Sequence, residues 1–492
     1  MKKTIITGLL AALVAFSSCE SWIDVKPSDR LSEGVLFSSR EGFLKALNGI
    51  YLAMADNSLY GLNMSAGPID VMGQYYNTNS SSHAYYYVSR YTYTNANPKA
   101  LFDNVWQKTY ELINNCNIIL EKCGDSNPHL NDTYFRIVKG ETLALRAMLH
   151  LDMFRLFGPI YSSTTQDTKC LPYMTLADQK VQPLSTAKDF CGYIMQDLTE
   201  ALGLLESADP VRTEGTLNST NPAGSNDLHY RQFRLNYFAV KTLIMRTQMV
   251  TGDNTNALAT AKAIIAEAKT GEKDIFPFVT TADATNATAP DRVFSTEVIY
   301  AIYKSNRVKV FEERFAHTLN SNNILTFAGS LTSGRVPELY DDQNDFRYRA
   351  WASAFNENGV STLYFRKFED ISGTSAVVSR SRHMMPLMRL SEIYLAVAEL
   401  TNDLTEGTEH LNRVRASRNC FSLEPANLGA LRDLATLEFR KEFIGEGQMF
   451  FYYKRRNTAA IPNGAAASGT VSMTVNNYVV PLPDSEISER VE

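Results

Sequence analysis

The stretch PLMRLSEIYLAVAELTNDLTEGTEHLNRVRASRN at residues 386–419 decides the fold of this chain. Its apolar residues recur at the spacing of one helical face. They are Leu390, Ile393, Tyr394, Val397 and Ala398. Turn-forming residues follow in TNDLTEG, and the helical spacing resumes at Leu411 and Val414. This helix-turn-helix has the length of one tetratricopeptide unit, and such a unit cannot bury its apolar face alone. We therefore expect neighbouring hairpins of the same kind.

A second helical hairpin is predicted at residues 237–268, where YFAVKTLIMRTQMV forms a helix, TGDN a turn, and ALATAKAIIAEA a closely packing helix of small residues. The apolar period predicts further helices over residues 41–54, 103–122, 141–157, 187–206 and 437–456, the last of them interrupted by Gly445 and Gly447. Apolar residues on both faces predict a short buried strand at residues 298–303. The sequence thus predicts a mainly α fold, in which a tetratricopeptide-like helix-turn-helix scaffold supports a loop-rich, minor-β half.

The N-terminus is predicted to be a signal peptide, residues 1–18. Lys2 and Lys3 make a basic start, and the apolar run that follows is too short to span a bilayer. Small residues then precede Cys19, as in a bacterial lipoprotein signal, where this cysteine becomes the lipidated first residue of the mature protein. The alternative is a plain secreted protein in which Cys19 is incidental.

The remainder, residues 19–492, is expected to form a single domain behind a tether at about residues 19–32, because no Pro/Ser-rich linker divides it. The formal net charge of −5 argues against nucleic acid as a partner. The six cysteines lack the paired spacing of a zinc site, and the seven histidines are scattered. We expect no metal, no cofactor and free buried thiols, with a disulfide between Cys170 and Cys191 as the alternative.

Residues 60–98 are rich in Gly, Asn and Ser, a composition that predicts a loop, and tyrosines crowd into it. Flat rings with a polar rim can stack on a sugar while neighbouring polar groups bond to its hydroxyls. The predicted ligand platform consists of Tyr75, Tyr76, Asn77, Tyr86, Tyr87 and Tyr91, with Trp351 as a second wall. The alternative for this segment is a strand at residues 85–93 with half of its rings buried. For Trp351 taken by itself, core packing is the preferred interpretation and an exposed stacking ring is the other.

Two charged clusters have structural interpretations. The acidic run at residues 341–345 lacks the Gly and the distal Glu of a calcium loop, so surface carboxylates paired with Arg347 and Arg349 are expected. The basic run at residues 454–456 is too short to bind a polyanion, and it is interpreted as a solvated helix end.

Several motifs together resemble the SusD/RagB family of outer-membrane nutrient-binding lipoproteins. ALRAMLHLDMFRLFGPI is similar to the family's Arg-Ala helix with an Arg-x-x-Gly end, and PLMRLSEIYLAVAE is similar to its Arg-Leu-x-Glu-x-Tyr-Leu helix. The matching residues are Arg146, Arg155, Gly158, Arg389, Glu392, Tyr394 and Glu399. LNRVRASR, FRKEFIGEGQMFFYYKR, VVPLPDSEI and the Asp345-x-Arg347 pair follow the family order. Met449 and Tyr452 depart from it, because the family usually carries Arg and Asp there.

The resemblance implies a lipid-anchored protein of the outer membrane, exposed on the cell surface. Such a protein sits over a SusC-like TonB-dependent transporter and hands it a glycan or, in some members, a peptide. The tetratricopeptide-like helices would contact the transporter, and the loop-rich half would bind the ligand.

Catalytic signatures are missing from the sequence. It contains no G-x-S-x-G, no H-E-x-x-H, no P-loop and no dinucleotide fingerprint. A glycan hydrolase is kept as an alternative, because two carboxylates across a cleft leave no sequence signature. A helical adaptor for proteins is a second alternative, but it leaves the tyrosine-rich loop unexplained. We expect a binding protein and not an enzyme.

Overall fold

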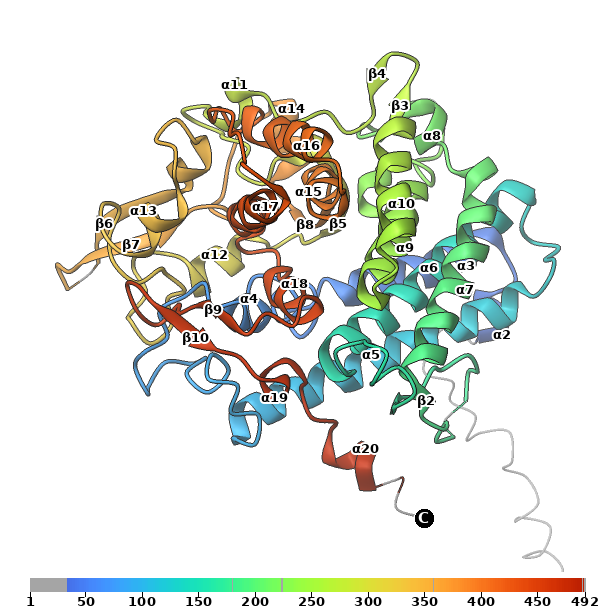
Figure 1. Cartoon of the computed structure of the whole chain (residues 1–492). Coiled ribbons are helices and arrows are strands. Elements are labelled where there is room, and N and C mark those ends of the chain that lie inside the picture. Colours follow the sequence, from blue (N-terminus) through green and yellow to red (C-terminus); the bar gives the residue numbers. More distant parts are fainter. Residues whose placement is uncertain (1–32, 179, 223, 357, 489, 491–492) are drawn as a thin grey trace, which may run out of the picture.

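The computed structural model describes residues 33–490 apart from residues 179, 223, 357 and 489. The predicted signal peptide, Cys19 and the predicted tether lie outside the described residues. The long helices stack in chain order: α5 on α6, α6 on α7, α7 on α9, α9 on α10, α10 on α15, and α15 on α16 and α17 (Figure 1). Their bounds are α5 Ala96–Cys123, α6 Asp132–Phe157, α7 Ala187–Ala208, α9 Tyr237–Thr251, α10 Asn254–Glu267, α15 Leu390–Leu400, α16 Leu404–Ala416 and α17 Leu428–Glu442.

Both helical hairpins predicted from the sequence are present. The Asn236 side chain caps α9 by accepting a hydrogen bond from the Ala239 N–H, and the helix ends at Gly252 with a φ of 78°. Glycine suits this left-handed turn because it has no Cβ. In the hairpin of α15 and α16 the Asp403 side chain caps α16 by accepting from the N–H groups of Thr405 and Glu406. The predicted mainly α, tetratricopeptide-like scaffold is confirmed.

The helix predicted over residues 437–456 is divided into α17 and α18, Met449–Arg455. The division lies at Gly445 and Gly447, whose φ values of 81° and 68° are incompatible with a continuous helix. The helices predicted over residues 41–54 and 187–206 form with bounds close to those expected, whereas α5 and α6 begin at Ala96 and Asp132, well before the predicted starts at residues 103 and 141. The shorter helices are α2 Glu33–Leu36, α3 Arg40–Met54, α4 Pro68–Met72, α8 Val211–Glu214, α11 Thr281–Ala284, α12 Val308–Arg314, α13 Arg335–Leu339, α14 Ala376–Ser381, α19 Val475–Tyr478 and α20 Asp484–Ser488, with 3-10 turns η1 Arg231–Phe233, η2 Ser295–Glu297 and η3 Phe346–Ala350.

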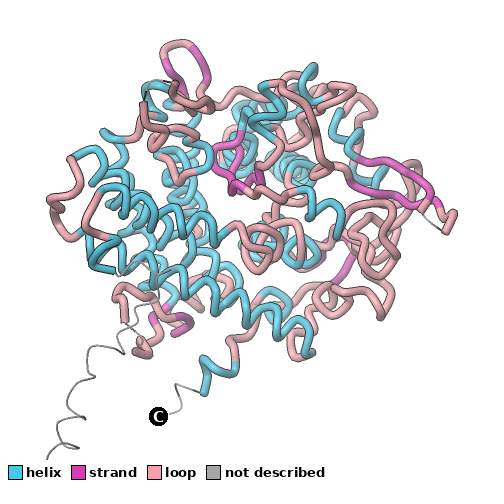
Figure 2. Tube along the Cα trace, turned by 180° about the vertical axis from the view of Figure 1, so that it is seen from behind, coloured by secondary structure: helices cyan, strands magenta, loops and turns pink. Residues whose placement is uncertain are grey.

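The strands pair only two at a time within the described residues, and all pairs are antiparallel. The buried strand predicted at residues 298–303 is β5, and it pairs with β8, which leads directly into α15. Figure 2 shows most of the loops gathered on the side of the molecule away from the helical stack. The strands are β1 Lys169–Leu171, β2 Ser185–Thr186, β3 Lys269–Thr270, β4 Lys273–Asp274, β5 Val298–Tyr303, β6 Trp351–Phe355, β7 Ser361–Phe365, β8 Met384–Arg389, β9 Ala460–Pro462 and β10 Thr470–Ser472.

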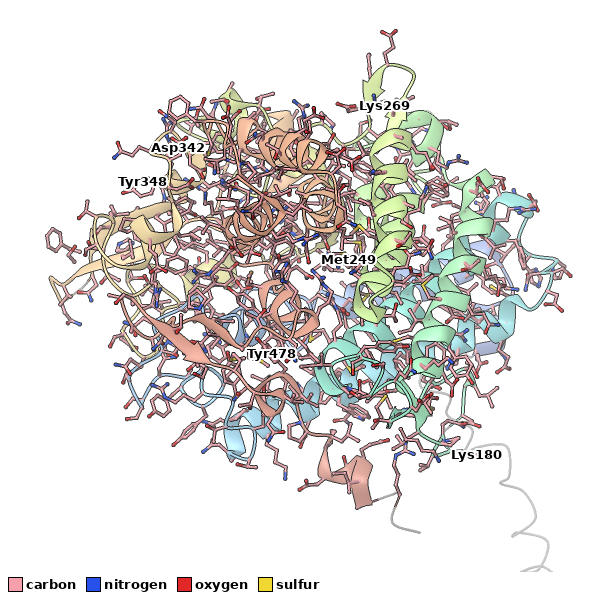
Figure 3. The ribbon with its side chains drawn as sticks, viewed as in Figure 1. Lys180, Met249, Lys269, Asp342, Tyr348 and Tyr478 are labelled. Carbon is pink, nitrogen blue, oxygen red and sulfur yellow. The ribbon has the colours of Figure 1, made fainter. Side chains whose placement is uncertain are left out.

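Apolar side chains of α9 face those of α15, α17 and α18 around a small cavity. Met249 of α9 lies near the centre of the molecule (Figure 3), where it lines a cavity of about 50 Å³ together with Ala396 of α15, Phe439 of α17 and Phe451 of α18. So small a cavity is close to continuous packing.

None of the described helices combines the length and hydrophobicity that a bilayer-spanning segment needs.

A buried network of ion pairs connects the helical scaffold with the loop-rich part. Arg389 and Arg418 are both 0% exposed, and each of them pairs with Glu297 and Glu442. Arg389 also donates from Nε to both carboxylate oxygens of Glu446, at 3.0 Å each. Glu297 belongs to η2 and Arg389 to β8. Arg418 follows the end of α16, Glu442 is the last residue of α17, and Glu446 lies in the turn after it. Arg389 and Arg418, by sharing Glu297 and Glu442, therefore link four separate segments of the chain.

The predicted pair between Asp345 and Arg347 is confirmed, but it is buried and not on the surface. Arg347 Nε donates to the two carboxylate oxygens of Asp345 at 2.9 and 3.1 Å. Asp341 pairs with Lys441, and no partner is found for the Arg349 side chain among the described residues. The surface interpretation failed because α17 packs over this acidic run, which the local sequence does not reveal.

The interpretation of residues 454–456 as a solvated helix end is wrong. Helix α18 is only seven residues long and lies against α4 and α6, so that Lys454 is 4% exposed. Its amino group donates to the carbonyl oxygens of Leu156 at 3.2 Å and Gly158 at 2.7 Å, and burial lowers the pKa of Lys454 to about 7. Arg455 and Arg456 both pair with the buried Glu399.

Candidate functional site: a loop face around Tyr86 and Arg90

The predicted tyrosine segment is a loop, and it is held by a second loop far along the chain. The Asn77 N–H donates to the carbonyl of Thr326 at 2.7 Å, and the Ala84 N–H donates to the carbonyl of Asn322 at 3.0 Å. A His83 ring nitrogen lies 3.3 Å from the Ile324 carbonyl oxygen. The alternative of a strand at residues 85–93 is wrong, because turns fill this segment.

Two members of the predicted platform are core residues. Tyr75 is 0% exposed, with its ring parallel to that of Phe327 at 6.1 Å and its hydroxyl donating to the Arg440 carbonyl at 2.7 Å. Tyr76 is 1% exposed, and its hydroxyl donates to the Asp70 carboxylate at 3.0 Å. Neither ring has a face free for a ligand. The prediction that they form a stacking surface is therefore corrected.

Tyr91 and Trp351 are also buried. The Tyr91 hydroxyl donates to the Met72 carbonyl at 2.8 Å. The Trp351 ring lies between Phe327, at 4.2 Å between ring centroids, and Phe365, at 4.6 Å. Core packing, the preferred interpretation of Trp351 by itself, is the one the structure supports. The platform prediction failed at these positions because a polar, turn-forming composition predicts a loop, whereas exposure depends on what the loop folds against.

Tyr86, Tyr87 and Asn77 are the predicted residues that stay partly exposed. The two rings meet edge to face at 5.1 Å. The Arg90 guanidinium lies over the Tyr86 ring at 3.7 Å, a cation–π contact. Arg90 also donates to the carbonyl oxygens of Thr78 at 3.2 Å and Tyr86 at 3.1 Å, so that its position is set by its own loop.

A cavity of about 480 Å³, lined by polar residues together with Ala465, Ala466 and Val471, lies beside this group. One wall comes from the tyrosine loop and includes Asn79 and Arg90, and the other comes from residues 463–477 and includes Asn463 and Asn477. The Gly464 N–H donates to the Gln74 side chain at 3.2 Å, which ties the two walls together. None of these four lining residues was among the ligand-binding residues predicted from the sequence. The Asn-rich composition of residues 77–80 was a signal for Asn79, but nothing local marks the contribution of the C-terminal segment.

The arrangement suits hydrogen bonding to hydroxyl groups. Amide side chains supply donors and acceptors together, an arginine supplies a planar array of donors, and half-exposed tyrosine rings supply flat apolar surface. No group of three or more His, Cys, Asp or Glu side chains able to hold a metal ion is found in the described part of the chain.

The five cysteines that the structure describes are free and buried. Cys170 and Cys191 therefore form no disulfide, which was the alternative interpretation. Burial raises the pKa of the Cys170 thiol to about 11. Such thiols are poor nucleophiles at neutral pH, and they act as small apolar side chains in the core.

Comparisons with known proteins agree with this architecture. A family model described as "Starch-binding associating with outer membrane" matches residues 21–215, and a model described as "SusD family" matches residues 285–489. The SusD-like protein P38 of Formosa agariphila is 21% identical over 482 residues, which cover 92% of this chain and 90% of that protein.

Solved structures with the same fold come from Bacteroides species. A SusD superfamily protein of Bacteroides thetaiotaomicron has a TM-score of 0.69 at 21% identity, covering 92% of this chain and 98% of that one. A SusD-like carbohydrate binding protein of Bacteroides vulgatus has a TM-score of 0.68 at 17% identity, covering 92% and 96%. These likenesses show the fold, and the two family models together account for most of the sequence. The chain belongs to the SusD/RagB family.

Proposed function

We propose that this protein binds an oligo- or polysaccharide at the loop face around Tyr86 and Arg90 and delivers it to a SusC-like TonB-dependent transporter. The observation that carries the proposal is the partly exposed pair of Tyr86 and Tyr87, with Arg90 stacked on one ring, beside a cavity of about 480 Å³ whose walls carry amide side chains. Family membership supports the same ligand class. The helical scaffold would supply the transporter contact, as the resemblance to the family implies.

Binding without catalysis is part of this proposal. One relative of the same fold is described as a SusD-like carbohydrate binding protein, and another as a surface glycan-binding protein of Bacteroides thetaiotaomicron, with a TM-score of 0.61 at 16% identity, covering 92% of this chain and 98% of that one. A glycan array with purified protein would identify the ligand. Glycan recovered after long incubation should carry no new reducing ends, and their reproducible appearance would favour the hydrolase alternative.

Replacing Tyr86 with alanine is expected to weaken glycan binding by up to about tenfold, because stacking on one ring contributes about 0.5 to 1.5 kcal/mol beyond area burial. Titration calorimetry with the best ligand from the array measures the affinity. The melting temperature should stay close to that of the parent, since the ring is only half buried.

Tyr193→Ala is the matched control, because this tyrosine is 44% exposed on α7, a helix of the scaffold. It should bind the glycan as the parent does. Parental affinity in both Tyr86→Ala and Tyr87→Ala would place the site elsewhere, and selective binding of peptides in place of glycans would favour the peptide-binding alternative.

We also propose that Cys19, outside the described residues, is the lipid anchor that holds the protein on the outer membrane facing the cell exterior. Cys19→Ala should release the protein from the membrane fraction or leave it unprocessed, because the acyl chains that contribute about 0.8 kcal/mol per buried methylene are then missing. Fractionation and labelling with radioactive fatty acid measure the outcome. A variant that still carries the label in the outer membrane contradicts the proposal.

A further inference from the structure

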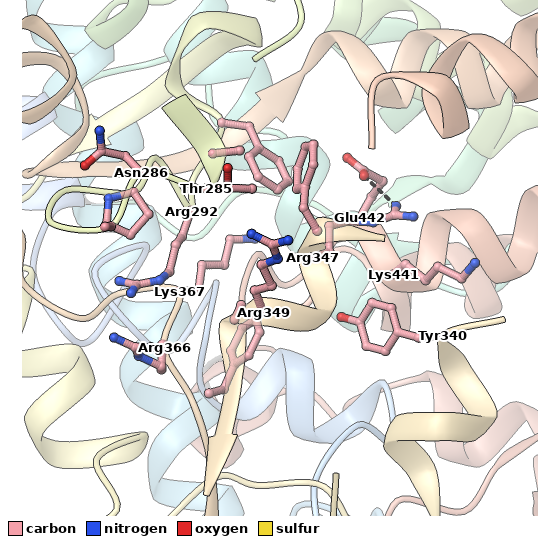
Figure 4. A pocket seen from close by; sticks show the side chains of 17 residues that line it. Thr285, Asn286, Arg292, Tyr340, Arg347, Arg349, Arg366, Lys367, Lys441 and Glu442 are labelled. Carbon is pink, nitrogen blue, oxygen red and sulfur yellow. Dashed lines mark hydrogen bonds and ion pairs between the residues drawn. The ribbon is translucent and has the colours of Figure 1, made fainter. Parts of the chain in front are cut away.

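A second cavity lies in the loop-rich part, lined by residues from four stretches of the chain, 284–294, 340–350, 365–367 and 441–442 (Figure 4). Residues 284–294 form one wall, residues 346–350 with 365–367 at the base of the β6–β7 hairpin form another, and the end of α17 closes the back. Its volume is about 230 Å³. No residue of the Tyr86 loop lines it, so it is distinct from the loop face proposed above.

The cavity is lined by six cationic side chains and one carboxylate, that of Glu442. Three of the cations are already neutralised by neighbouring acids. Arg347 pairs with Asp345, Glu438 and Glu442, while Lys367 pairs with Glu446 and Lys441 pairs with Asp341 and Glu438. These three belong to the ion pairs of the core, and they are not free to bind a ligand.

The other three cations, Arg292, Arg349 and Arg366, lack matching acids. Arg292 and Arg366 share the single carboxylate of Glu369, at 3.1 and 2.8 Å to the same oxygen. Among the described residues no hydrogen bond or ion pair is found for the Arg349 side chain, which is exposed. Among the described residues, these three arginines are thus paired with one carboxylate, which leaves an excess of two positive charges on this wall.

Figure 4 shows the side chains of Arg292 and Arg366 next to each other at one side of the cavity. The Arg366 N–H donates to the Ala350 carbonyl at 2.7 Å, and this bond holds the backbones that carry Arg349 and Arg366 side by side. Burial and the nearby charge of Arg366 lower the pKa of Arg292 to about 10. Like charges kept this close are stabilised when an anion joins them.

The chemistry of the wall selects the group that fits. Guanidinium groups present planar forks that match the oxygens of a carboxylate or a sulfate ester. Phe294 and Phe346 add apolar surface, and Asn286 at the rim adds an amide. The volume is below the roughly 300 Å³ at which sites for larger ligands begin, which suits one sugar unit with its charged group.

We propose that this cavity is a binding site for the carboxylate or sulfate ester of an acidic sugar, with Arg349 as the principal contact and Arg292 and Arg366 as its neighbours. The inference rests on the protein being a glycan binder. It adds a second site with a charge requirement that the polar loop face does not impose.

The test compares methyl β-D-glucuronide and glucose 6-sulfate with the neutral methyl β-D-glucoside, each titrated into the purified protein and followed by ligand-observed NMR. Arg349→Gln should weaken binding of the two acidic sugars by about tenfold or more, because hydrogen bonds to charged groups are the stronger ones. Raising the salt concentration should weaken the same two ligands in the parent protein. Binding of the neutral glucoside should change in neither experiment.

Arg136→Gln is the matched control, since this partly exposed arginine lies on α6 of the scaffold and, among the described residues, pairs with Asp132 in a surface ion pair. It should leave all three ligands unaffected. Equal binding of the glucoside and the glucuronide by the parent, or unchanged glucuronide binding in both Arg349→Gln and Arg349→Glu, would overturn the proposal.

Inorganic sulfate is the further arm. If it binds as tightly as glucose 6-sulfate, the sugar contributes nothing and the site is one for free anions, which also overturns the proposal. None of these outcomes would contradict the proposed glycan binding at the loop face, because that proposal is tested independently by the affinity of Tyr86→Ala.

Discussion

Replacement of Arg389 by methionine is expected to lower the free energy of unfolding by about 3 to 5 kcal/mol, the usual cost of breaking a buried ion pair from one side. The arginine is fully buried and contacts three carboxylates: Nη1 lies 3.0 Å from Glu297 and 2.6 Å from Glu442, and Nε lies 3.0 Å from Glu446. Methionine fills much of the same space but leaves these acids short of one positive charge. Since small domains have only about 5 to 15 kcal/mol of stability in total, the loss is severe.

Urea unfolding followed by circular dichroism measures this loss as a shift of the midpoint. Arg413→Met is the control, because Arg413 is exposed on α16, the helix that leads to Arg418. It should unfold at nearly the parental midpoint. The same midpoint in Arg389→Met would show that the network adds no net stability.

A double variant separates the missing charge from the missing packing. Burial raises the pKa of Glu297, and one of its carboxylate oxygens has no hydrogen-bond partner among the described residues, so this acid is the least satisfied of the three. Adding Glu297→Gln to Arg389→Met removes one negative charge and restores the balance. Part of the lost stability should return, because the damage comes chiefly from the uncompensated charge.

Trp351→Ala is expected to cost about 3 to 5 kcal/mol of stability, the range for truncating a large buried ring. The ring is 3% exposed and packs against Phe327 and Phe365, and its indole N–H donates to the Tyr340 hydroxyl at 3.3 Å. Tyr76→Ala should cost a similar amount, since it removes a buried ring together with the hydrogen bond to Asp70.

Melting temperature and glycan affinity, measured on the same variants, distinguish core rings from ligand-binding rings. We expect Trp351→Ala and Tyr76→Ala to melt early, whereas Tyr86→Ala melts like the parent and binds weakly. Should Tyr76→Ala keep the parental melting temperature and lose affinity, the ligand platform predicted from the sequence would be right after all. Tyr76→Phe is the conservative control, because it keeps the ring and removes only the hydroxyl.

The helical scaffold could be predicted from the sequence because its signals are local. Apolar residues at 3.6-residue spacing set the faces of α9, α10, α15 and α16, and turn residues such as Gly252 and Asp403 mark their ends. The motif around Arg389 was equally visible, and it led to the right family. The motif did not indicate that Arg389 belongs to a buried network of ion pairs, because its partners are 53 to 92 residues away along the chain.

The ligand-binding surface depended on contacts that no local pattern contains. Composition was sufficient to predict that residues 75–93 form a loop, yet Tyr75 and Tyr76 are buried while Tyr86 is not, because Phe327 and the segment at Gly445 fold over only one part of that loop. Likewise, the sequence contains every arginine of the second cavity, but it does not tell which carboxylates lie next to them. The excess of positive charge follows from the positions of those carboxylates in the folded chain. Secondary structure follows from neighbours along the chain, whereas exposure and charge balance follow from neighbours in space, and these were decided by the tertiary structure.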